Sequence, residues 1–558
     1  MTLPNVDSIC VVIGRTRHGM LVHEIAEAAA QGAKLIEVRL DFLKKAPDFK
    51  RLLEAKPCAM LATVRRPPDG GKWAGSEDQR RTLIRQAIVA GFDWVDLETD
   101  AADAIPRFGP VRRIVSYHNF REMPADLEAI HARMCCQDAD IIKVVVRATQ
   151  PSDNLRILAL VKDAKKPTVA FCMGDMGFPS RILQAKFGAP FTYAAFNKER
   201  NIAPGMPSFD EVRKLYNYEH IDPDTEVFGV IGDPVGHSLS PLIHNIAFRK
   251  LHMNAVYLPF RVPRDTLPAF LKAFEDLPVK GYSVTIPHKE AAAASAATRD
   301  TTVERTGAAN TLVRGEDGFR AFNTDYGGVV QTLQEFLPTF TQAVVDPAVV
   351  LPTIQMPKID LPAGALTAPA SLTGEGFTDK PRPLAPTVEP ATYTMSAVLT
   401  GRVVLVLGAG GVARAVAHAL QREGSIVTIC NRTAERATAL ATDVGCRHVD
   451  WHARHSVLCD LVINCTSIGM HPDVDVMPVH PSFLKPGLVV FDTVYTPEQT
   501  LLIKEARERN CHTITGVELF IRQASLQFQH FTGRSAPVDL FRKVVRRALS
   551  PITLKDDE

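Results

Sequence analysis

The sequence predicts an α/β fold that begins with a (β/α)8 barrel and ends with a doubly wound nucleotide-binding domain. Eight short apolar runs alternate with helical patterns over residues 9–196, which is typical of parallel α/β architecture. A glycine-rich junction between a strand and a helix follows residue 407, and such junctions bind phosphate groups. The 558 residues, 46% hydrophobic and 23% charged, suit three or four globular domains of roughly 150 residues each.

The charge balance gives no overall electrostatic case for nucleic acid or anionic lipid as a partner, and it leaves a local basic patch open. The 64 Lys and Arg residues nearly cancel the 62 Asp and Glu residues, so the net charge of +2 provides no overall attraction to nucleic acid or to anionic lipid. No run of about 18 apolar residues lacks a charge or a proline, and we therefore expect no membrane span.

The cysteines and histidines indicate neither disulfides nor a metal. The ten cysteines contain no C-x-x-C spacing, which favours reduced thiols in the cytoplasm; the plastid stroma is the alternative if a transit peptide has been removed. A cluster with metal-like spacing contains His448, Asp450, His452 and His455. No second ligand pair follows this cluster, so we expect no metal site.

The first block of the chain carries the barrel pattern. The predicted strands are Ile9–Ile13, Leu35–Leu40, Met60–Val64, Trp94–Leu97, Arg113–Tyr117, Ile141–Val146, Thr168–Cys172 and Phe191–Phe196. Helical spacing separates them: Leu21, Ile25 and Ala28 share one face, and Gly32 is placed to end that helix. An open doubly wound sheet also fits the alternation, but eight strands favour closure into a barrel.

Composition also marks the boundaries between the blocks. The connector Ile221-Asp222-Pro223-Asp224 precedes a second α/β block, and residues 338–396 hold ten of the 39 prolines with no sustained apolar periodicity. This segment predicts a flexible insertion. The expected division is 1–220 for the barrel, 226–337 for the second α/β domain, 338–396 for the insertion, 397–515 for the nucleotide-binding domain and 516–550 for C-terminal helices that return to the second domain.

The nucleotide-binding motif follows an apolar strand at 403–407. The motif is G-x-G-x-x-A, formed by Gly408, Gly410, Gly411 and Ala413, and its glycines allow a pyrophosphate to approach the helix N-terminus. The next predicted strand leads into Asn431-Arg432-Thr433. A domain that selects NAD usually places an acidic residue near this point. Arg432 instead offers a cation to a 2′-phosphate, which favours NADP.

Polar motifs also recur at or just beyond the carboxyl ends of the predicted barrel strands, where barrel enzymes build their sites. They are Glu37-Val-Arg39-Leu-Asp41, Thr63-Val-Arg65, Ser116-Tyr117-His118, Asp140-Ile-Ile-Lys143 and Ser180-Arg181. The second block and the C-terminal part contain a further ordered set: His237-Ser238-Leu239-Ser240-Pro241, Ser283 to Lys289, Gly307 to Thr311, Phe322-Asn323-Thr324-Asp325, Asn464 to Met470, Asp492 to Pro497 and Gly516 to Ala524.

In both halves these motifs resemble the fused type I 3-dehydroquinate dehydratase and shikimate dehydrogenase familiar from plants. The resemblance covers nearly the whole chain except 338–396. It implies a TIM barrel that dehydrates 3-dehydroquinate to 3-dehydroshikimate. It further implies a two-domain shikimate dehydrogenase, ending in a Rossmann NADP-binding domain, that reduces this product to shikimate with NADPH.

The resemblance assigns roles to six barrel residues. Lys143 matches the Schiff-base lysine, and its apolar neighbours in the strand disfavour an ammonium and leave more free amine to attack a ketone. His118 matches the general acid/base, and Glu37 the carboxylate that assists it. Substrate-binding arginines are matched by Arg39, Arg65 and Arg181, whose planar guanidinium groups suit a carboxylate.

In the dehydrogenase half, Lys289 and Asp325 match a catalytic pair that can relay a proton to the substrate oxygen. The residues that match substrate contacts are Ser238, Ser240, Thr285, Asn310, Tyr495 and Gln523. The residues expected to bind NADP are Gly408, Gly410, Gly411, Ala413, Asn431, Arg432, Thr433, Arg436, Thr466 and Gly469.

One loop departs from the family pattern. The family's Ser-Ala-Pro-Gly-Gln aligns with Ile202-Ala203-Pro204-Gly205-Met206, so two polar substrate contacts are missing from the barrel.

Two rival functions remain open: a dehydrogenase with an impaired barrel, or a non-enzymatic regulator of quinate use. The regulator is disfavoured because Lys143, His118, Lys289 and Asp325 are all present. Quinate as an additional substrate and the oligomeric state remain open.

Overall fold

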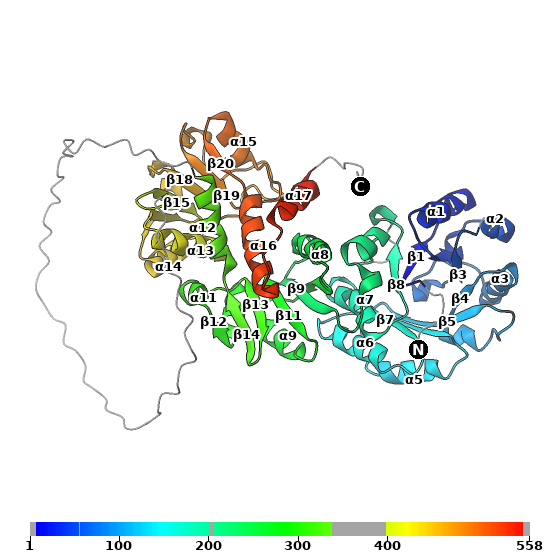
Figure 1. The fold of residues 1–558 in the computed structure, drawn as a ribbon. Helices are drawn as coiled ribbons and strands as arrows, with labels where there is room; N and C mark the ends of the chain where they lie inside the picture. The colour runs from blue at the N-terminus through cyan, green and yellow to red at the C-terminus, as the bar shows by residue number, and fades with distance from the viewer. Residues whose placement is uncertain (1–6, 55, 201–204, 338–397, 551–558) are drawn as a thin grey trace, which may run out of the picture.

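The protein is described by a computed structural model over residues 7–54, 56–200, 205–337 and 398–550 (Figure 1). The described part contains three sheets, of eight, six and six strands. The first belongs to the blue-to-cyan N-terminal half, and the other two lie in the green and the yellow-to-orange parts of the chain (Figure 1). The insertion predicted at 338–396 falls outside the described residues.

The first sheet is the predicted barrel. Its strands are β1 (Ile9–Ile13), β2 (Leu35–Arg39), β3 (Ala59–Thr63), β4 (Trp94–Glu98), β5 (Arg112–Asn119), β6 (Ile141–Arg147), β7 (Thr168–Met173) and β8 (Thr192–Ala195). The ends of the predicted strands are shifted by no more than two residues, and all the pairings are parallel. Helices cover the outside: α1 (His18–Ala30), α2 (Phe49–Leu53), α3 (Glu77–Ala90), α4 (Thr99–Ala102), α5 (Leu127–Cys135), α6 (Asp153–Lys162) and α7 (Phe178–Leu183).

The barrel has one seam without a backbone ladder. The strand order runs β7-β6-β5-β4-β3-β2-β1-β8, so within the described residues β7 and β8 do not pair. Side chains that follow β7 replace the missing ladder: Ser180 Oγ accepts from Cys172 N at 2.9 Å, and Gln184 Oε1 accepts from Ala170 N at 3.2 Å. Gln184 also donates to Thr192 Oγ1 on β8 at 3.1 Å. Helix α7 therefore closes the barrel and brings Arg181 beside β8.

The second sheet has the order β10-β9-β11-β13-β14-β12. Its strands are β9 (Glu226–Gly232), β10 (Ala255–Arg261), β11 (Val279–Val284), β12 (Thr298–Arg299), β13 (Thr311–Gly315) and β14 (Gly318–Phe322). Its helices are α8 (Ser240–Lys250), α9 (Leu267–Ala273), α10 (Lys289–Ser295), α11 (Thr301–Thr306) and α12 (Thr324–Phe336). Strands β9, β10 and β11 are parallel, whereas β13 is antiparallel to both of its neighbours.

The third sheet is fully parallel and has the order β17-β16-β15-β18-β19-β20. Its strands are β15 (Val403–Leu407), β16 (Ile426–Cys430), β17 (Arg447–Val449), β18 (Leu461–Asn464), β19 (Val489–Asp492) and β20 (His512–Ile514), and its helices are α13 (Gly411–Arg422), α14 (Ala434–Val444) and α15 (Leu501–Glu508). The order reverses between β15 and β18, which is the Rossmann arrangement and the place where such domains bind dinucleotides. The predicted fold class is confirmed.

Two long helices connect the second and third sheets. Helix α12 packs against both α13 and α16 (Gly516–Thr532), and α16 also contacts β11 and β13. The last helix, α17 (Val538–Leu549), packs against α16 and α8. In Figure 1, α12 and α16 run side by side between the two sheets. None of the helices in the described ranges is long and apolar enough to cross a membrane.

A neutral histidine is enclosed in the aromatic core between α8 and α16. His244 is fully buried, lies parallel to Tyr257 with ring centroids 4.4 Å apart, and stacks on Phe528. Neither of its ring nitrogens has a hydrogen-bond partner among the described residues. Burial lowers the pKa of His244 from 6.5 to about 3. His244 is protonated at a higher pH in the unfolded chain than in the folded chain. Protonation therefore favours unfolding, and the free energy of unfolding falls as the pH decreases below 6.5.

We predict that His244→Phe makes the protein less sensitive to acid. Between pH 6.5 and pH 5 the wild type should lose roughly 2 kcal/mol of unfolding free energy through this one histidine, and the variant should not. Calorimetric unfolding at pH 7.5 and pH 5 measures the difference. His512→Phe, at an exposed position on β20, is the control and should leave the pH dependence unchanged. Equal acid sensitivity of His244→Phe and wild type would contradict the prediction.

Candidate active sites

A cavity of about 230 Å3 opens inside the barrel. All six predicted barrel residues line it: Glu37, Arg39, Arg65, His118, Lys143 and Arg181. They come from β2, the loop after β3, β5, β6 and α7. Because all the strands are parallel, these side chains meet near one end of the barrel, as the motif positions predict.

Lys143 lies on β6 with its side chain almost completely buried. Its Nζ is 3.8 Å from the centroid of the Tyr193 ring and 3.2 Å from Asp96 Oδ2. The apolar environment predicted from its neighbours in the strand is therefore incomplete, because a carboxylate lies directly beside the amine. An ammonium is stabilised both by this carboxylate and by the face of the aromatic ring.

His118 lies on β5 and is held by Arg65, whose Nη1 is 2.7 Å from His118 Nδ1. Burial lowers the pKa of His118 well below 6.5, and the positive charges of Arg65 and Lys143 add to this effect. The imidazole is therefore neutral near pH 7 and able to accept a proton. Glu37 lines the same cavity, and among the described residues no hydrogen bond joins it to His118.

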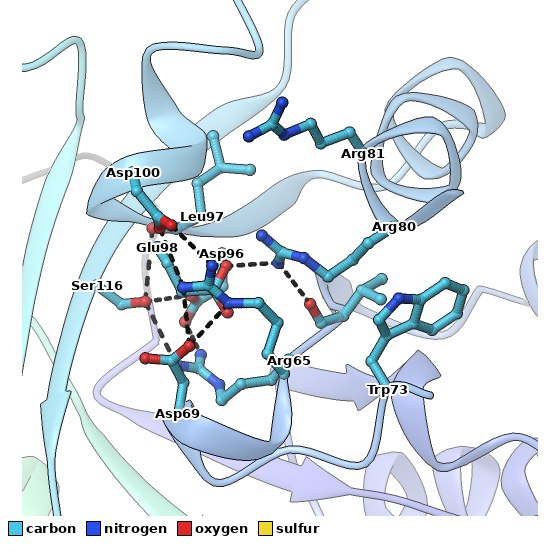
Figure 2. Close-up of polar contacts among 12 residues, drawn as sticks. Arg65, Asp69, Trp73, Arg80, Arg81, Asp96, Leu97, Glu98, Asp100 and Ser116 are labelled. Carbon is cyan, nitrogen blue, oxygen red and sulfur yellow. Dashed lines mark hydrogen bonds and ion pairs between the residues drawn. The ribbon is translucent and has the colours of Figure 1, made fainter. Parts of the chain in front are cut away.

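Asp96 on β4 was not singled out from the sequence. It accepts a hydrogen bond from Ser116 Oγ at 2.6 Å and forms an ion pair with Arg65 at 2.7 Å (Figure 2). Burial opposes its charge, but Arg65 and Lys143 outweigh burial and lower the pKa of Asp96 below its usual range. The sequence did contain a signal for Asp96. Two carboxylates interrupt the apolar strand Trp94-Val-Asp96-Leu-Glu98, just as Lys143 interrupts another apolar strand, and charged residues are rare in buried strands.

Arg181 is a buried cation that has no counter-ion among the described residues. Its guanidinium lies 4.0 Å from the centroid of the Phe171 ring and donates to the Tyr193 carbonyl at 3.4 Å. No carboxylate of the described residues pairs with it, and burial lowers its pKa. Arg39, in contrast, is already neutralised by two hydrogen bonds to Asp41, at 2.9 and 2.8 Å. An unpaired guanidinium in a closed cavity favours an anionic ligand.

The altered loop reaches the cavity through Met206. This side chain lines the cavity and packs against the barrel interior, which includes Phe171 and Tyr193. Gly205 adopts a φ of +71° and lies close to Gly174 at the end of β7. Ile202 lies outside the described residues. Met206 thus faces the cavity at the position where the family pattern has a polar residue.

A second cavity, of about 400 Å3, lies between the second and third sheets. It is lined by both predicted catalytic residues and all six predicted substrate contacts: Lys289, Asp325, Ser238, Ser240, Thr285, Asn310, Tyr495 and Gln523. Lys289 begins α10 and donates to Asp325 near the start of α12, with Nζ and Oδ2 2.6 Å apart. A paired ammonium and carboxylate at a cavity wall can pass a proton to a bound oxygen.

A buried chain of hydrogen bonds supports this second cavity and was not predicted. Tyr257 donates to Ser283 at 2.6 Å, Ser283 donates to Gln527 at 2.8 Å, and Gln527 donates to the Asn310 carbonyl at 3.0 Å. The chain ties α16 to β11 and to the loop that carries Asn310. Gln527 follows Gln523 by one helical turn, and two glutamines on one face of a helix were the available signal.

The start of α13 leaves room for a dinucleotide. Gly408 has a φ of +118°, and a Cβ there would lie 2.9 Å from the Cys465 carbonyl oxygen, whereas Gly410 faces open space. Bare backbone at the N-terminus of a twelve-residue helix suits a pyrophosphate. A Cβ at Gly411 would lie 3.4 Å from the Lys289 side chain, so this crevice adjoins the second cavity.

The other predicted cofactor residues surround this crevice. Arg432 and Arg436 are exposed beside the start of α14 and form no ion pair with any described residue, which leaves two cations for a 2′-phosphate. Thr433 precedes α14, and Asn431 donates to its carbonyl at 3.0 Å. Ala413 is buried in α13, which follows β15. Thr466 and Gly469 lie in the loop that follows β18.

Fold and cavities together define an enzyme with two sites, one around a buried lysine in a barrel and one beside a dinucleotide-binding crevice. Family models match the chain in order: Type I 3-dehydroquinase at 9–223, shikimate dehydrogenase substrate binding domain at 230–312, Shikimate / quinate 5-dehydrogenase at 391–470 and Shikimate 5′-dehydrogenase C-terminal domain at 516–546.

Individual relatives match one or both halves. The chain is 34% identical to a chloroplastic bifunctional 3-dehydroquinate dehydratase/shikimate dehydrogenase of Arabidopsis thaliana, over 97% of this chain and 85% of the relative. It is 35% identical to a shikimate dehydrogenase (NADP(+)) of Methanosarcina acetivorans, over 58% of this chain and 98% of the relative. A Thermus thermophilus shikimate 5-dehydrogenase solved with NADP(H) and shikimate is 28% identical with a TM-score of 0.45, over 58% of this chain and all of that one. The chain belongs to the family of bifunctional 3-dehydroquinate dehydratase/shikimate dehydrogenases.

Restoring the missing polar group at position 206 should improve the barrel site. A hydrogen bond to a neutral group contributes roughly 0.5–1.5 kcal/mol, so Met206→Gln should lower the KM for dehydroquinate by about two- to tenfold. Steady-state kinetics measure the change. Met173→Gln, which places the same side chain on another wall of the cavity, is the control and should bring no gain. The missing-contact explanation is wrong if neither Met206→Gln nor the Ile202→Ser/Met206→Gln double variant raises kcat/KM.

Arg432 should determine the choice between NADPH and NADH. A charged hydrogen bond contributes roughly 1.5–3 kcal/mol, so Arg432→Ala should raise the KM for NADPH by about ten- to a hundredfold. The KM for NADH should barely move, because NADH has no 2′-phosphate. Arg447→Ala, at another exposed arginine of the same sheet, serves as control. Equal losses with both cofactors would refute this role.

Proposed function

We propose that the barrel dehydrates 3-dehydroquinate to 3-dehydroshikimate through a Schiff base on Lys143, and that the C-terminal half reduces this product to shikimate with NADPH at Lys289 and Asp325. The observation that carries the proposal is the barrel cavity itself. It joins a buried lysine, a neutral histidine and an unpaired buried guanidinium, which are a nucleophile, a base and a site for the substrate carboxylate.

In the barrel, the Lys143 amine adds to the ketone carbon, and the ketone oxygen leaves as water, with one proton from the amine nitrogen and one from solvent, to give an iminium. His118 then takes the proton from the carbon beside the iminium, and the neighbouring hydroxyl leaves as water with a proton returned by His118. A second water hydrolyses the iminium and frees Lys143. Arg181 orients the substrate by binding its carboxylate.

In the C-terminal half, Ser238 and Ser240 at the start of α8 bind the carboxylate of dehydroshikimate, and Asn310, Thr285 and Gln523 bind its hydroxyls. NADPH held in the crevice before α13 would supply the hydride for the ketone carbon. Lys289 donates a proton to the ketone oxygen, and Asp325 holds the ammonium in place at 2.6 Å. The glycines before α13 and the cations Arg432 and Arg436 hold the nucleotide.

We further propose that the domain division follows the three sheets, with boundaries at 1–220, 226–337 and 397–515 and with 516–550 returning to the second sheet. Contacts of α16 with β11 and β13 support this return. All ten cysteines are free thiols, which supports a reducing compartment such as the cytoplasm.

One assay tests both activities. Purified protein receives dehydroquinate with and without NADPH, while the enone absorbance of dehydroshikimate and the loss of NADPH are recorded together. The proposal predicts enone accumulation without NADPH, and enone consumption with equimolar NADPH loss when it is present. Activity with dehydroshikimate but none with dehydroquinate would identify a dehydrogenase with an inactive barrel. Inactivity with both substrates would favour a regulatory protein.

Borohydride should trap the substrate on Lys143. Reduction of the iminium gives a stable secondary amine, so treatment with dehydroquinate and borohydride should abolish the dehydratase and spare the dehydrogenase. Peptide mass spectrometry locates the adduct. Lys289→Met is the matched control, because it should still be labelled at Lys143 while losing only the dehydrogenase. An adduct on another residue, or full dehydratase activity of Lys143→Ala, would disprove the assignment.

A further inference from the structure

Asp96 lies between two buried cations of the barrel, Lys143 and Arg65, and Figure 2 shows its contacts with Arg65 and Ser116. Its Oδ2 is 3.2 Å from Lys143 Nζ and 2.7 Å from Arg65 Nη2, and its side chain is completely buried. Its Oδ1 accepts a hydrogen bond from Ser116 Oγ at 2.6 Å. Asp96 is not among the residues that line the cavity, so it acts on Lys143 and Arg65 rather than on the substrate.

We propose that Asp96 is a positioning residue of the dehydratase, which fixes the Lys143 amine at the cavity and serves as counter-ion to its nitrogen throughout the Schiff-base cycle. This inference rests on the proposed function of the barrel. The nitrogen is neutral when it attacks the ketone and positively charged once water has left and the iminium has formed. A charge that forms in a buried site requires a fixed partner of opposite sign.

Asp96 is held in place independently of the lysine. Strands β4, β5 and β6 are adjacent, and Ser116 on β5 is paired with both Glu98 on β4 and Lys143 on β6. The hydrogen bond from Ser116 and the ion pair with Arg65 keep the carboxylate in position while the charge on Lys143 changes. The carboxylate is thus preorganised and does not move as the reaction proceeds.

The same carboxylate also orients the base. Asp96 anchors Arg65, and Arg65 Nη1 lies 2.7 Å from His118 Nδ1. One side chain therefore sets the distance between the nucleophile and the group that moves the proton. Loss of its charge should displace both groups, and displacements of this kind cost about 100-fold in rate.

A matched control lies on the same strand. Glu98, two residues further on, is also buried and accepts from Arg80 at 2.6 Å (Figure 2). Among the described residues the ion-pair partner of Lys143 is Asp96 and not Glu98. Asp96 and Glu98 each form an ion pair with an arginine, but of these two carboxylates only Asp96 also contacts Lys143 Nζ.

The test compares Asp96→Asn, Ser116→Ala and Glu98→Gln with wild type. Each variant is assayed for the kcat and KM of dehydration and for the rate at which borohydride traps the adduct on Lys143. Circular dichroism and thermal unfolding of each variant report on folding of the barrel, and the dehydrogenase activity of the same chain is the internal standard for protein amount. We expect Asp96→Asn to lower kcat and the trapping rate together by about 100-fold with a much smaller change in KM. Ser116→Ala should lower both by roughly three- to tenfold, because Asp96 loses one of its hydrogen bonds. Glu98→Gln should remain near wild type.

The outcomes separate this inference from the proposed function. If wild type forms no adduct on Lys143, the proposed function fails and the role of Asp96 fails with it. If wild type is trapped but Asp96→Asn keeps its kcat and trapping rate within a few-fold, or Glu98→Gln loses as much, only the role of Asp96 is overturned. If Asp96→Asn does not fold, Ser116→Ala decides, and unchanged rates in that variant would overturn the inference.

Discussion

The barrel site depends on balancing positive charge where water is excluded. Lys143, Arg65 and Arg181 are all buried beside one small cavity, and each would be costly there without a partner. Asp96 forms an ion pair with each of the first two, and its single negative charge balances only one of the two positive charges. Arg181 has an aromatic face and one carbonyl but no carboxylate among the described side chains, so its counter-ion is expected from the substrate. The site is therefore complete only when an anion is bound, which couples substrate binding to the electrostatics of the barrel.

The second site depends on a different constraint, which is the joining of two sheets across a cleft. Helices α12 and α16 pack against each other, and α12 also packs against α13. Asp325 lies at the start of α12 and Gln523 on α16, so the helices that join the sheets also carry residues that line the second cavity. The hydrogen-bond chain from Tyr257 to Gln527 fixes α16 to the second sheet. The crevice at Gly408 and the pair of Lys289 and Asp325 consequently lie side by side.

Local patterns in the sequence predicted much of this architecture. Strands buried on both faces appear as continuous apolar runs, and a lysine or a glycine-rich turn within such a run is conspicuous. The features that were missed depend on long-range pairing. In the sequence, nothing shows the partners of Asp96, because its contacts form only when β4, β5 and β6 lie side by side. The partners of Gln527 are likewise not evident until the packing of α16 against β11 is known. The seam between β7 and β8 was also missed, because Ser180 and Gln184 replace its ladder with side-chain hydrogen bonds that no periodicity shows.

The central claim is that a substrate on Lys143 has Arg181 at its carboxylate and Asp96 at its nitrogen. The most direct measurement is a crystal structure of the borohydride-reduced adduct. The account predicts continuous density from Lys143 Nζ to the ligand ring, a two-pronged contact between the ligand carboxylate and Arg181, and Asp96 within hydrogen-bond distance of the new secondary amine. A ligand carboxylate bound to Arg39 with Arg181 unoccupied, or a nitrogen turned away from Asp96, would contradict it.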